Sequence, residues 1–570
     1  MLSAPEVERF ILGLEGRVAP VERVVREAWW HLATAGTEEA QQELVRAGKK
    51  YNRLFADGNE YRKIRAWHEE REALENGLLR RQVEVVYRVF AGRQGDEEAL
   101  DRIEELEAKA NAVYGNHRGV VGDEDVGENE IREILRFSGD GALRREAWEA
   151  SKTVGREVEG TVRELARLRN RLAREAGYPD HFHRSLDLQE IDSGELDRIM
   201  SGLESATDAP FRRLKGESDE ALRQRFGVET VMPWHLSDPF FQSCKQEAAA
   251  LPSPASRGGA GDASEASDYE LMSSANLDTS TAAEMDVDRF FRHKDLEVLT
   301  RKTYDNMGLE VRDVLARSDL YERDGKNQHA FCLSVGREYP YDVRVLANVR
   351  PDSYWMDTML HEFGHATYDK HIDPKLPYFL RTIAHTCTTE AIALMMGSLA
   401  EDPAWLSAVA EIPEAELGEI REHLFWRERA DKLVFVRWAL VMFHFERELY
   451  ANPDRDDLNE LWWSLVERLQ LVKRPPGRDE PDWAAKIHVA IAPVYYHNYV
   501  IGNLISAQLR SHLETRVTGG QPFFASEVAG RYLLEAVFGP GARNGWEKTV
   551  IGATGERLNP EYFARSLRYV

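Results

Sequence analysis

Residues 354–370 read Tyr-Trp-Met-Asp-Thr-Met-Leu-His-Glu-Phe-Gly-His-Ala-Thr-Tyr-Asp-Lys and enclose the pattern His-Glu-x-x-His. We expect this stretch to form one helix, on which positions i and i+4 lie on the same face. His361 and His365 can therefore hold one zinc ion between them, and Glu362 beside them can polarise a water molecule. The pattern predicts a zinc site carried by a helix.

A catalytic zinc ion needs a third protein ligand, and the sequence offers two candidates. His371 follows His361 by ten residues, a spacing used when a third histidine comes after a bend, but Tyr368 stands where that bend normally has a glycine. Glu390 is the single carboxylate of the apolar segment 388–396, and a carboxylate in such a helix is costly unless it is paired or bound to metal. We therefore favour Glu390 over His371 as the third ligand.

The segments around the zinc helix predict a mainly α protein with one small antiparallel sheet beside that helix. Alternating apolar residues at 329–335 and 341–350 are typical of two strands. Residues 1–230 carry apolar side chains every three or four positions, and the stop Ala-Gly-Tyr-Pro at 176–179 ends one such helix. Because the repeats are not sustained heptads, packed helical hairpins are favoured over a coiled coil.

We expect one elongated, two-lobed structural unit with two subdomains and a deep central cleft. Residues 1–230 would form the helical lid and wall of the cleft, and residues 231–570 the catalytic part with the zinc helices. The Ala-, Ser- and Gly-rich segment 248–283 cannot bury enough apolar surface to offset its ordering entropy, so it is predicted to be a mobile insertion. Two interpretations of this segment remain: a surface loop, or a gate over the cleft.

Composition narrows the class of partner. The chain has 570 residues, with 74 Lys and Arg against 98 Asp and Glu, and a formal net charge of −24. Such a charge argues against a nucleic-acid partner, because phosphate neutralisation needs clustered basic side chains. Three cysteines make no disulfide framework, no secretory signal is evident, and no run approaches the roughly 18 apolar residues of a membrane span. We expect a soluble, cytoplasmic protein without a membrane partner, and the oligomeric state stays open.

A second cluster of polar and aromatic residues lies at 486–499. Lys486 and His488 precede the run Pro-Val-Tyr-Tyr-His-Asn-Tyr, in which Tyr496 and Tyr499 share a helix face. A His and a Tyr near an activated water can donate hydrogen bonds to the oxyanion of a tetrahedral intermediate, and a Lys can receive a substrate carboxylate. Ordinary aromatic packing at helical spacing is the alternative.

Together these motifs resemble the angiotensin-converting-enzyme-like peptidyl-dipeptidases, which are zinc peptidases with a downstream glutamate ligand. The matching blocks keep the family's order: Met-Pro-Trp-His-Leu at 232–236, His-Ala at 329–330, the zinc motif at 361–365, Glu-Ala-Ile at 390–392, Trp-Trp-Ser-Leu at 462–465 and Lys-Ile-His at 486–488. The residues at 172–178 also look like the family's Asn-Gly-Tyr region. The runs at 361–365 and 493–499 are similar as well to thimet-type oligopeptidases.

The resemblance implies a role for each matching residue. His361, His365 and Glu390 would bind one Zn²⁺ per chain, and Glu362 would act as the general base. Two further catalytic residues, His488 and Tyr499, would stabilise the oxyanion.

The resemblance also implies how a short peptide is held. His329 and the backbone of Ala330 would hold it like an added strand, and Lys486 would bind its C-terminal carboxylate. Tyr496 matches the first of two family tyrosines, although one extra residue after His488 leaves Tyr495 as an alternative. The substrate-binding set is therefore His329, Ala330, Lys486, Tyr495 and Tyr496.

Several positions depart from the family pattern. Leu394 stands where the family has an aspartate that orients a zinc histidine, so another group would have to do so. Val466 and Asn498 replace two arginines associated with bound chloride, which argues against chloride activation. Gln242 is close to the family's carboxylate-binding glutamine but off register.

The sequence thus predicts a zinc metallopeptidase that releases C-terminal dipeptides from short peptides. The nearer alternative is an oligoendopeptidase of the thimet type, which cuts internally and ignores the C-terminus. A remote alternative is a non-catalytic helical peptide-binding protein. The intact Glu362 argues against the last, because a site that only binds needs no general base.

Overall fold

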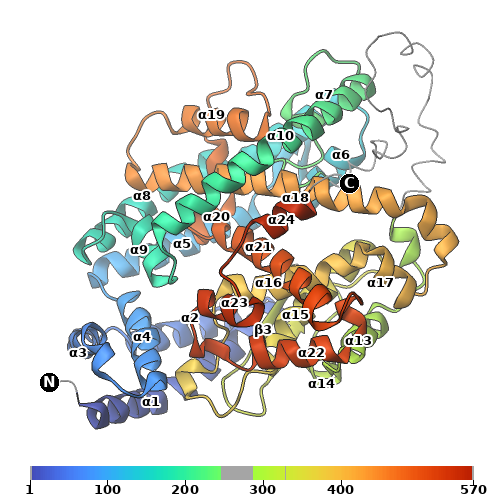
Figure 1. Ribbon diagram of the computed structural model, residues 1–570. Helices are drawn as coiled ribbons and strands as arrows, with labels where there is room; N and C mark the ends of the chain where they lie inside the picture. Colours follow the sequence, from blue (N-terminus) through green and yellow to red (C-terminus); the bar gives the residue numbers. More distant parts are fainter. Residues whose placement is uncertain (1–2, 245–286, 328, 568–570) are drawn as a thin grey trace.

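The computed structural model describes residues 3–244, 287–327 and 329–567 of the chain (Figure 1). The segment 248–283, for which a mobile insertion was predicted, lies outside the described residues. The described parts are mainly helical, as predicted, and contain two small antiparallel sheets.

The N-terminal part is a succession of helices, several of which begin at strong capping residues. Asp57, Asn76, Asp96 and Asp192 each accept a backbone N–H of the following first turn. The predicted helical character of this part is confirmed. Its helices are α1 (Ala4–Ala35), α2 (Glu38–Arg53), α3 (Gly58–Glu69), α4 (Gly77–Ala91), α5 (Glu97–Asn116), α6 (Glu128–Phe137), α7 (Gly141–Lys152), α8 (Val154–Glu175), α9 (His181–Leu188) and α10 (Ser193–Phe226).

One hairpin in this part was not predicted. Strands β1 (Gly119–Val121) and β2 (Glu124–Val126) pair antiparallel around the turn Gly122-Asp123. Gly122 has a φ of 62°, a left-handed conformation that glycine adopts without strain. Strands of three residues are too short to show an alternating pattern, so the Gly-Asp pair was the one available signal.

The C-terminal part contains the predicted zinc helix and its neighbours. Its helices are α13 (Leu296–Asn306), α14 (Arg312–Arg317), α15 (Ser353–Lys370), α16 (Thr386–Gly397), α17 (Pro403–Ala408), α18 (Glu414–Ala451), α19 (Leu458–Gln470), α20 (Ile487–Ile491), α21 (Tyr496–His512), α22 (Glu527–Leu533), α23 (Trp546–Thr554) and α24 (Glu561–Ser566). Short 3-10 turns lie at Arg71–Ala73, Pro233–His235, Val287–Phe290, Tyr378–Leu380, Ser398–Glu401, Asp482–Ala485, Phe523–Ala525 and Gly541–Arg543, and π-helical turns at Leu513–Val517 and Leu534–Phe538.

The second sheet lies beside the zinc helix, as predicted. Strand β3 (Phe331–Ser334) pairs antiparallel with β4 (Val343–Leu346), and both strands contact α15. The two predicted strands are confirmed, although each is shorter than the alternating run that indicated it. Helix α15 begins one residue earlier than predicted because Asp352 caps it and accepts the N–H of Trp355.

Close packing of α15, α16 and α21 positions the site. A Cβ atom placed on Gly364 would lie 2.9 Å from the Cα of Ala393, and one on Gly502 would lie 3.1 Å from the Cβ of Glu390. Side chains at these two glycines would push α16 away from its neighbours. The glycines therefore set how closely the backbone that carries Glu390 approaches the zinc helix.

Helix α1 is tied to the C-terminal part by a buried polar link. Glu22 is 4% exposed and accepts hydrogen bonds from Arg337 at 2.9 Å and from the Tyr378 hydroxyl at 2.6 Å. Arg337 lies three residues after the end of β3, and α1 also contacts β3. Apolar residues of α1, α3 and α4 form a core of their own, to which Tyr378 and Phe379 of the C-terminal part also belong.

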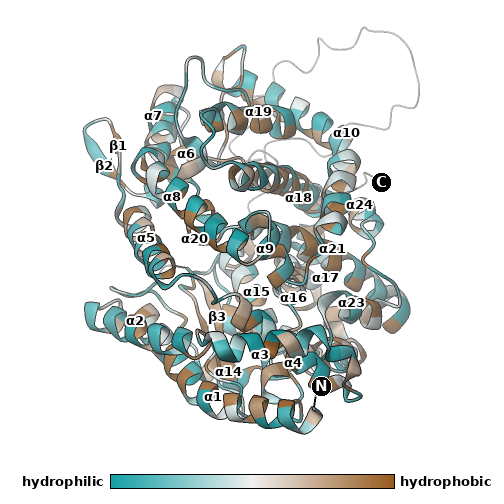
Figure 2. Ribbon diagram, turned by 90° about the vertical axis from the view of Figure 1, so that its left-hand side faces the viewer, coloured by the Kyte–Doolittle hydropathy of each residue, from teal (hydrophilic) through white to brown (hydrophobic). Residues whose placement is uncertain are grey.

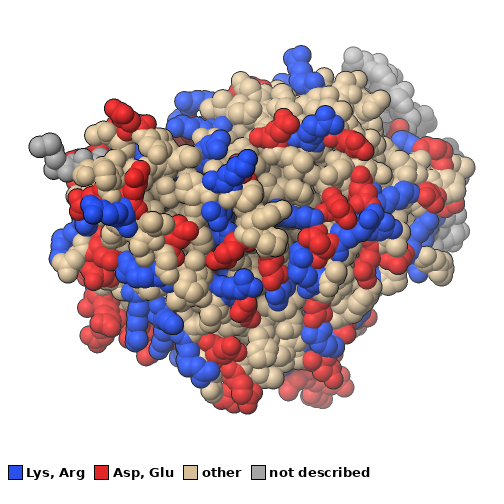
Figure 3. All heavy atoms as spheres, turned by 90° about the horizontal axis from the view of Figure 1, so that it is seen from below, with Lys and Arg blue, Asp and Glu red and all other residues tan. Residues whose placement is uncertain are grey.

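The surface carries both signs of charge without a dominant basic patch on the face in view. Figure 3 shows Lys and Arg interspersed with Asp and Glu. The outlying helix α2 is mostly hydrophilic, whereas α16 is buried over nearly its whole length (Figure 2). Among the described residues, no helix combines the length and the hydropathy that a membrane crossing requires.

Candidate metal centre and active site

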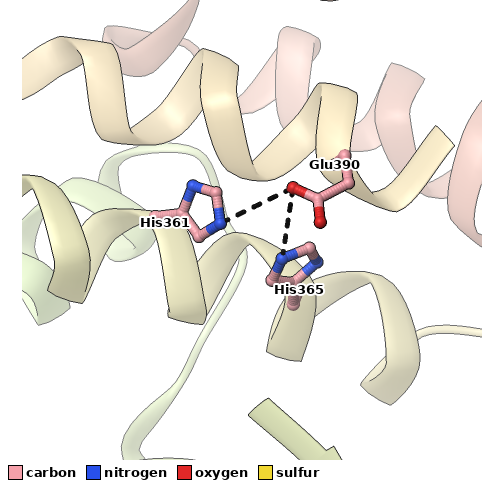
Figure 4. Close-up of side chains that lie close together, drawn as sticks. All are labelled: His361, His365 and Glu390. Carbon is pink, nitrogen blue, oxygen red and sulfur yellow. Dashed lines mark ion pairs between the residues drawn. The ribbon is translucent and has the colours of Figure 1, made fainter. Parts of the chain in front are cut away.

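His361, His365 and Glu390 converge from two helices (Figure 4). The first two come from successive turns of α15 and the third from α16. The Nε2 atoms of His361 and His365 lie 3.8 Å and 4.0 Å from the Oε2 atom of Glu390. One ligand atom from each residue lies within 4.8 Å of the others. Two nitrogens and one oxygen are the donor set that would hold a zinc ion with room left for a reactant.

The electrostatics of these three side chains fit a zinc ion. Burial lowers the pKa of both histidines, so that each imidazole is neutral and offers a lone pair. Burial also raises the pKa of Glu390, against the opposing effects of His361 and Tyr495. Among the described residues, the buried Oε2 atom of Glu390 has no hydrogen-bond partner. A buried carboxylate oxygen is costly in that state, and a cation between the three side chains would satisfy it.

His371 does not join this group. Helix α15 continues to Lys370 without the bend that would bring a third histidine back. The Nδ1 atom of His371 instead lies 2.8 Å from the backbone oxygen of Thr367, and its ring stacks on Phe538. The structure therefore gives His371 local partners away from the candidate ligands.

Two residues that sequence reasoning did not assign to the metal site support the candidate ligands. The Thr389 hydroxyl lies 2.7 Å from the Nδ1 atom of His365 and can fix the orientation of that ring. The Tyr495 hydroxyl hydrogen-bonds to Glu390. Tyr495 was assigned to substrate, whereas here it contacts a candidate ligand. Leu394, as expected, offers no carboxylate.

Glu362 is 8% exposed. Burial and the neighbouring Glu390 carboxylate raise the pKa of Glu362 to about 8, while the backbone N–H of Cys332 in β3 donates to its side chain and opposes the rise. A carboxylate with a pKa near neutrality can both take up and return a proton. The position therefore suits a general base that later acts as an acid.

His488 lies close to two tyrosines in the first turn of α21, Tyr496 and Tyr499. The ring of Tyr496 lies 5.0 Å from that of His488 and 5.7 Å from that of Tyr499. Burial lowers the pKa of His488 to about 4, helped by Lys486, so the imidazole is neutral near pH 7. Burial and two nearby glutamates raise the pKa of Tyr499 to about 12, so its hydroxyl keeps its proton. Both side chains can act as neutral hydrogen-bond donors.

Lys486 lies in a half-buried aromatic pocket. Its Nζ atom lies 5.4 Å from the ring centre of Phe240 and 5.6 Å from that of Trp438. It donates a 2.9 Å hydrogen bond to the Oε1 atom of Gln242, which the sequence had placed off register. Tyr496 packs edge-on against Trp438, so the same pocket brings these side chains together.

His329 and Ala330 directly precede β3. His329 is exposed, and its backbone N–H donates to Asn327. His329 also contributes to the low pKa of His488, which places the two side chains near each other. An extended peptide could add to the chain here as a further strand. At the two positions where arginines were expected from the resemblance, Val466 is buried in the apolar core and Asn498 donates to Gln189 at 2.8 Å.

Two histidines on one helix, a glutamate on the next and a neighbouring buried glutamate form, in a mainly helical fold, the kind of donor set that zinc peptidases use. The chain belongs to the angiotensin-converting enzyme family of peptidases. The family model, described as angiotensin-converting enzyme of peptidase family M2, matches residues 3–206 and 323–561.

Two curated relatives are similar to parts of the chain. Thermostable carboxypeptidase 1 of Pyrococcus furiosus is 25% identical over 232 residues, which cover 36% of this chain and 45% of the relative. Angiotensin-converting enzyme of Bos taurus is 25% identical over 187 residues, which cover 31% of this chain and 14% of the relative. The chain thus spans less than half the length of each relative that it matches.

Proposed function

We propose that the protein is a zinc metallopeptidase that releases dipeptides from the C-terminus of short peptides. The observation that carries the proposal is the joint presence of the His361, His365 and Glu390 group and of Lys486 in a pocket beside His488. The first supplies a metal centre, and the second supplies a cation for a free chain end. Membership of a peptidase family and a relative named as a carboxypeptidase support both parts.

His361, His365 and Glu390 would hold the zinc ion, which supplies a Lewis acid for hydrolysis at neutral pH. Glu362 takes the proton from the attacking water and passes it to the leaving amine. His488 and Tyr499 donate hydrogen bonds to the oxyanion that forms as water adds to the scissile carbonyl. The peptide lies along His329 and Ala330, and Lys486 fixes its last carboxylate.

Replacing Lys486 with Met should weaken the use of peptides with a free C-terminus. A charge-assisted hydrogen bond in a half-buried pocket contributes about 1.5–3 kcal/mol, which corresponds to about 10- to 150-fold in kcat/KM. Steady-state kinetics on one peptide and on its C-terminal amide would measure this effect. Only kcat/KM for the free acid should fall. Equal effects on both, or no effect on either, would favour an oligoendopeptidase that does not read chain ends.

The pH dependence of kcat/KM should also reveal the contact between Lys486 and the substrate carboxylate. Burial lowers the pKa of Lys486 to about 8, so its ammonium is present below that pH and is lost above it. For an N-acetylated free-acid peptide, kcat/KM should therefore fall as the pH rises through about 8, while the amide lacks this limb. Acetylation removes the substrate's own α-amino group, which titrates at about 7.7–8.0. A limb at the same pH for both peptides would assign it to another group.

We also propose a reducing, cytoplasmic location with short peptides as the partners. The thiols Cys332 and Cys387, which form no disulfide, support this, because disulfides are the rule for small secreted proteins and rare in reducing compartments.

A further inference from the structure

The side-chain amide of Gln242 joins two charged groups. Its Oε1 atom accepts the hydrogen bond from Lys486 at 2.9 Å, and its Nε2 atom donates to the Oδ2 atom of Asp238 at 3.1 Å. An ammonium can only donate and a carboxylate can only accept, so the two neighbours together fix which end of the amide faces which partner. Asp238 thus decides that an acceptor, and not a donor, faces Lys486.

Asp238 also fixes the backbone from which Gln242 projects. Its Oδ1 atom accepts the backbone N–H groups of Phe240 at 2.9 Å and of Gln242 at 3.1 Å. The amide of Gln470 donates to the backbone oxygens of Phe240 and Phe241, and Phe241 has a φ of 51°. The turn is held in one conformation from several sides, as a residue in that region of φ requires.

The charges around Lys486 make Asp238 its main counter-charge. Burial lowers the pKa of Lys486, Asp238 raises it, and on α6 Arg132 lowers it while Glu128 raises it. A second amine, Lys152, lies on the Phe240 ring at 3.1 Å from its centre and is 4% exposed.

Lys152 has four charged neighbours of its own, and one of them is Lys486. The four are Asp238, Asp482, Arg478 and Lys486. Arg478 is itself paired with Asp482 at 2.6 Å, so Asp482 already has a strong cationic partner. Among the described residues, Asp238 forms no ion pair with a guanidinium, and its charge acts on both amines, Lys152 and Lys486.

We infer that Asp238 is a positioning residue for recognition of the substrate's C-terminal carboxylate, acting through the Gln242 amide on Lys486. The inference rests on the proposed function, in which Lys486 receives that carboxylate. Asp238 keeps the Gln242 oxygen turned toward the ammonium, which fixes the amine in the pocket with its remaining N–H groups free to meet the substrate.

The test uses Asp238→Asn in the full-length zinc enzyme. An asparagine can turn its NH₂ toward Gln242, where two donors then meet, so the amide must flip or lose its partner. We expect kcat/KM for a free-acid peptide to fall about 10-fold, mainly through KM, with little change for its amide. The alkaline limb near pH 8 should move to lower pH, because the ammonium loses its counter-charge.

A double-mutant cycle separates coupling from general damage. If Asp238 acts through Lys486, Asp238→Asn should have no further effect on the acid-to-amide ratio in a Lys486→Met background. Gln242→Met, which removes the bridge while leaving Asp238 in place, should reproduce the loss for the free acid. An undiminished effect of Asp238→Asn in the Lys486→Met background would overturn the inference.

Competitive acetylation followed by mass spectrometry reports the titration of Lys486 without any substrate. Asp238→Asn should lower its midpoint. The control Asp431→Asn should leave it unchanged, since Asp431 holds the end of the same segment through Ser243 and Cys244. An unchanged midpoint in Asp238→Asn overturns the inference even if the parent prefers free acids. A parent that treats acid and amide alike overturns the proposed function, and the titration still decides the contact between Asp238 and Lys486.

Discussion

Glu362→Gln is expected to keep its zinc and to lose about three orders of magnitude or more in kcat. The amide has the size of the carboxylate but cannot take a proton from water, and it cannot return one to the leaving amine, so both proton transfers fail. Glu362 is 8% exposed and receives the N–H of Cys332, so the variant should keep the local packing. Metal analysis and steady-state turnover of one peptide would be measured on the same preparation.

Asp369→Asn is the matched control for that substitution. It changes another carboxylate of α15 to its amide, seven residues or about two helical turns further along. We expect this control to keep both zinc and turnover. A zinc-loaded Glu362→Gln enzyme with near-normal turnover would rule out Glu362 as the general base.

Glu390→Ala should empty the metal site. It removes one of three ligands and leaves two neutral imidazoles, so we expect zinc affinity to fall by more than about 100-fold, since even loss of an outer-shell partner costs about 10- to 100-fold. Purified protein should then carry far less than one zinc per chain, as measured by mass spectrometry of the metal. Peptidase activity should fall with the zinc content and should recover in part when zinc is added in excess.

His371→Ala provides the contrast for Glu390→Ala. His371 was the other candidate, and its imidazole instead contacts Thr367 and Phe538. That variant should retain zinc even if its folded state is less stable. Full zinc in Glu390→Ala together with lost zinc in His371→Ala would reverse the ligand assignment.

The helix at 353–370 and the meeting of Glu390 with His361 and His365 could be predicted because both rest on local physical rules. The i, i+4 spacing fixes the face of α15, and an isolated carboxylate in an apolar helix needs a partner. The orienting groups could not be predicted in the same way. Tyr495, the residue directly before α21, meets Glu390, and Thr389 meets His365 across a helix pair, so both contacts depend on packing between separate segments of the chain.

Gln242 shows where a motif-based prediction fails. It lies in an irregular turn, where neither the 3.6-residue nor the two-residue period fixes the register of a side chain. Only the folded turn, held by Asp238 and by Gln470, shows that its amide reaches Lys486. Likewise, strands as short as β1 and β2 carry too few residues for a period to be visible.

The link between Glu22, Arg337 and Tyr378 has a mechanical consequence. It fastens α1 to the residues that follow β3, and a buried charge pair resists separation because either partner alone would be left unpaired away from water. An outward swing of the N-terminal helices would therefore pull on β3 rather than slide past it. Because β3 is also paired with β4 and packed on α15, that pull would be opposed by the elements that carry the candidate metal ligands.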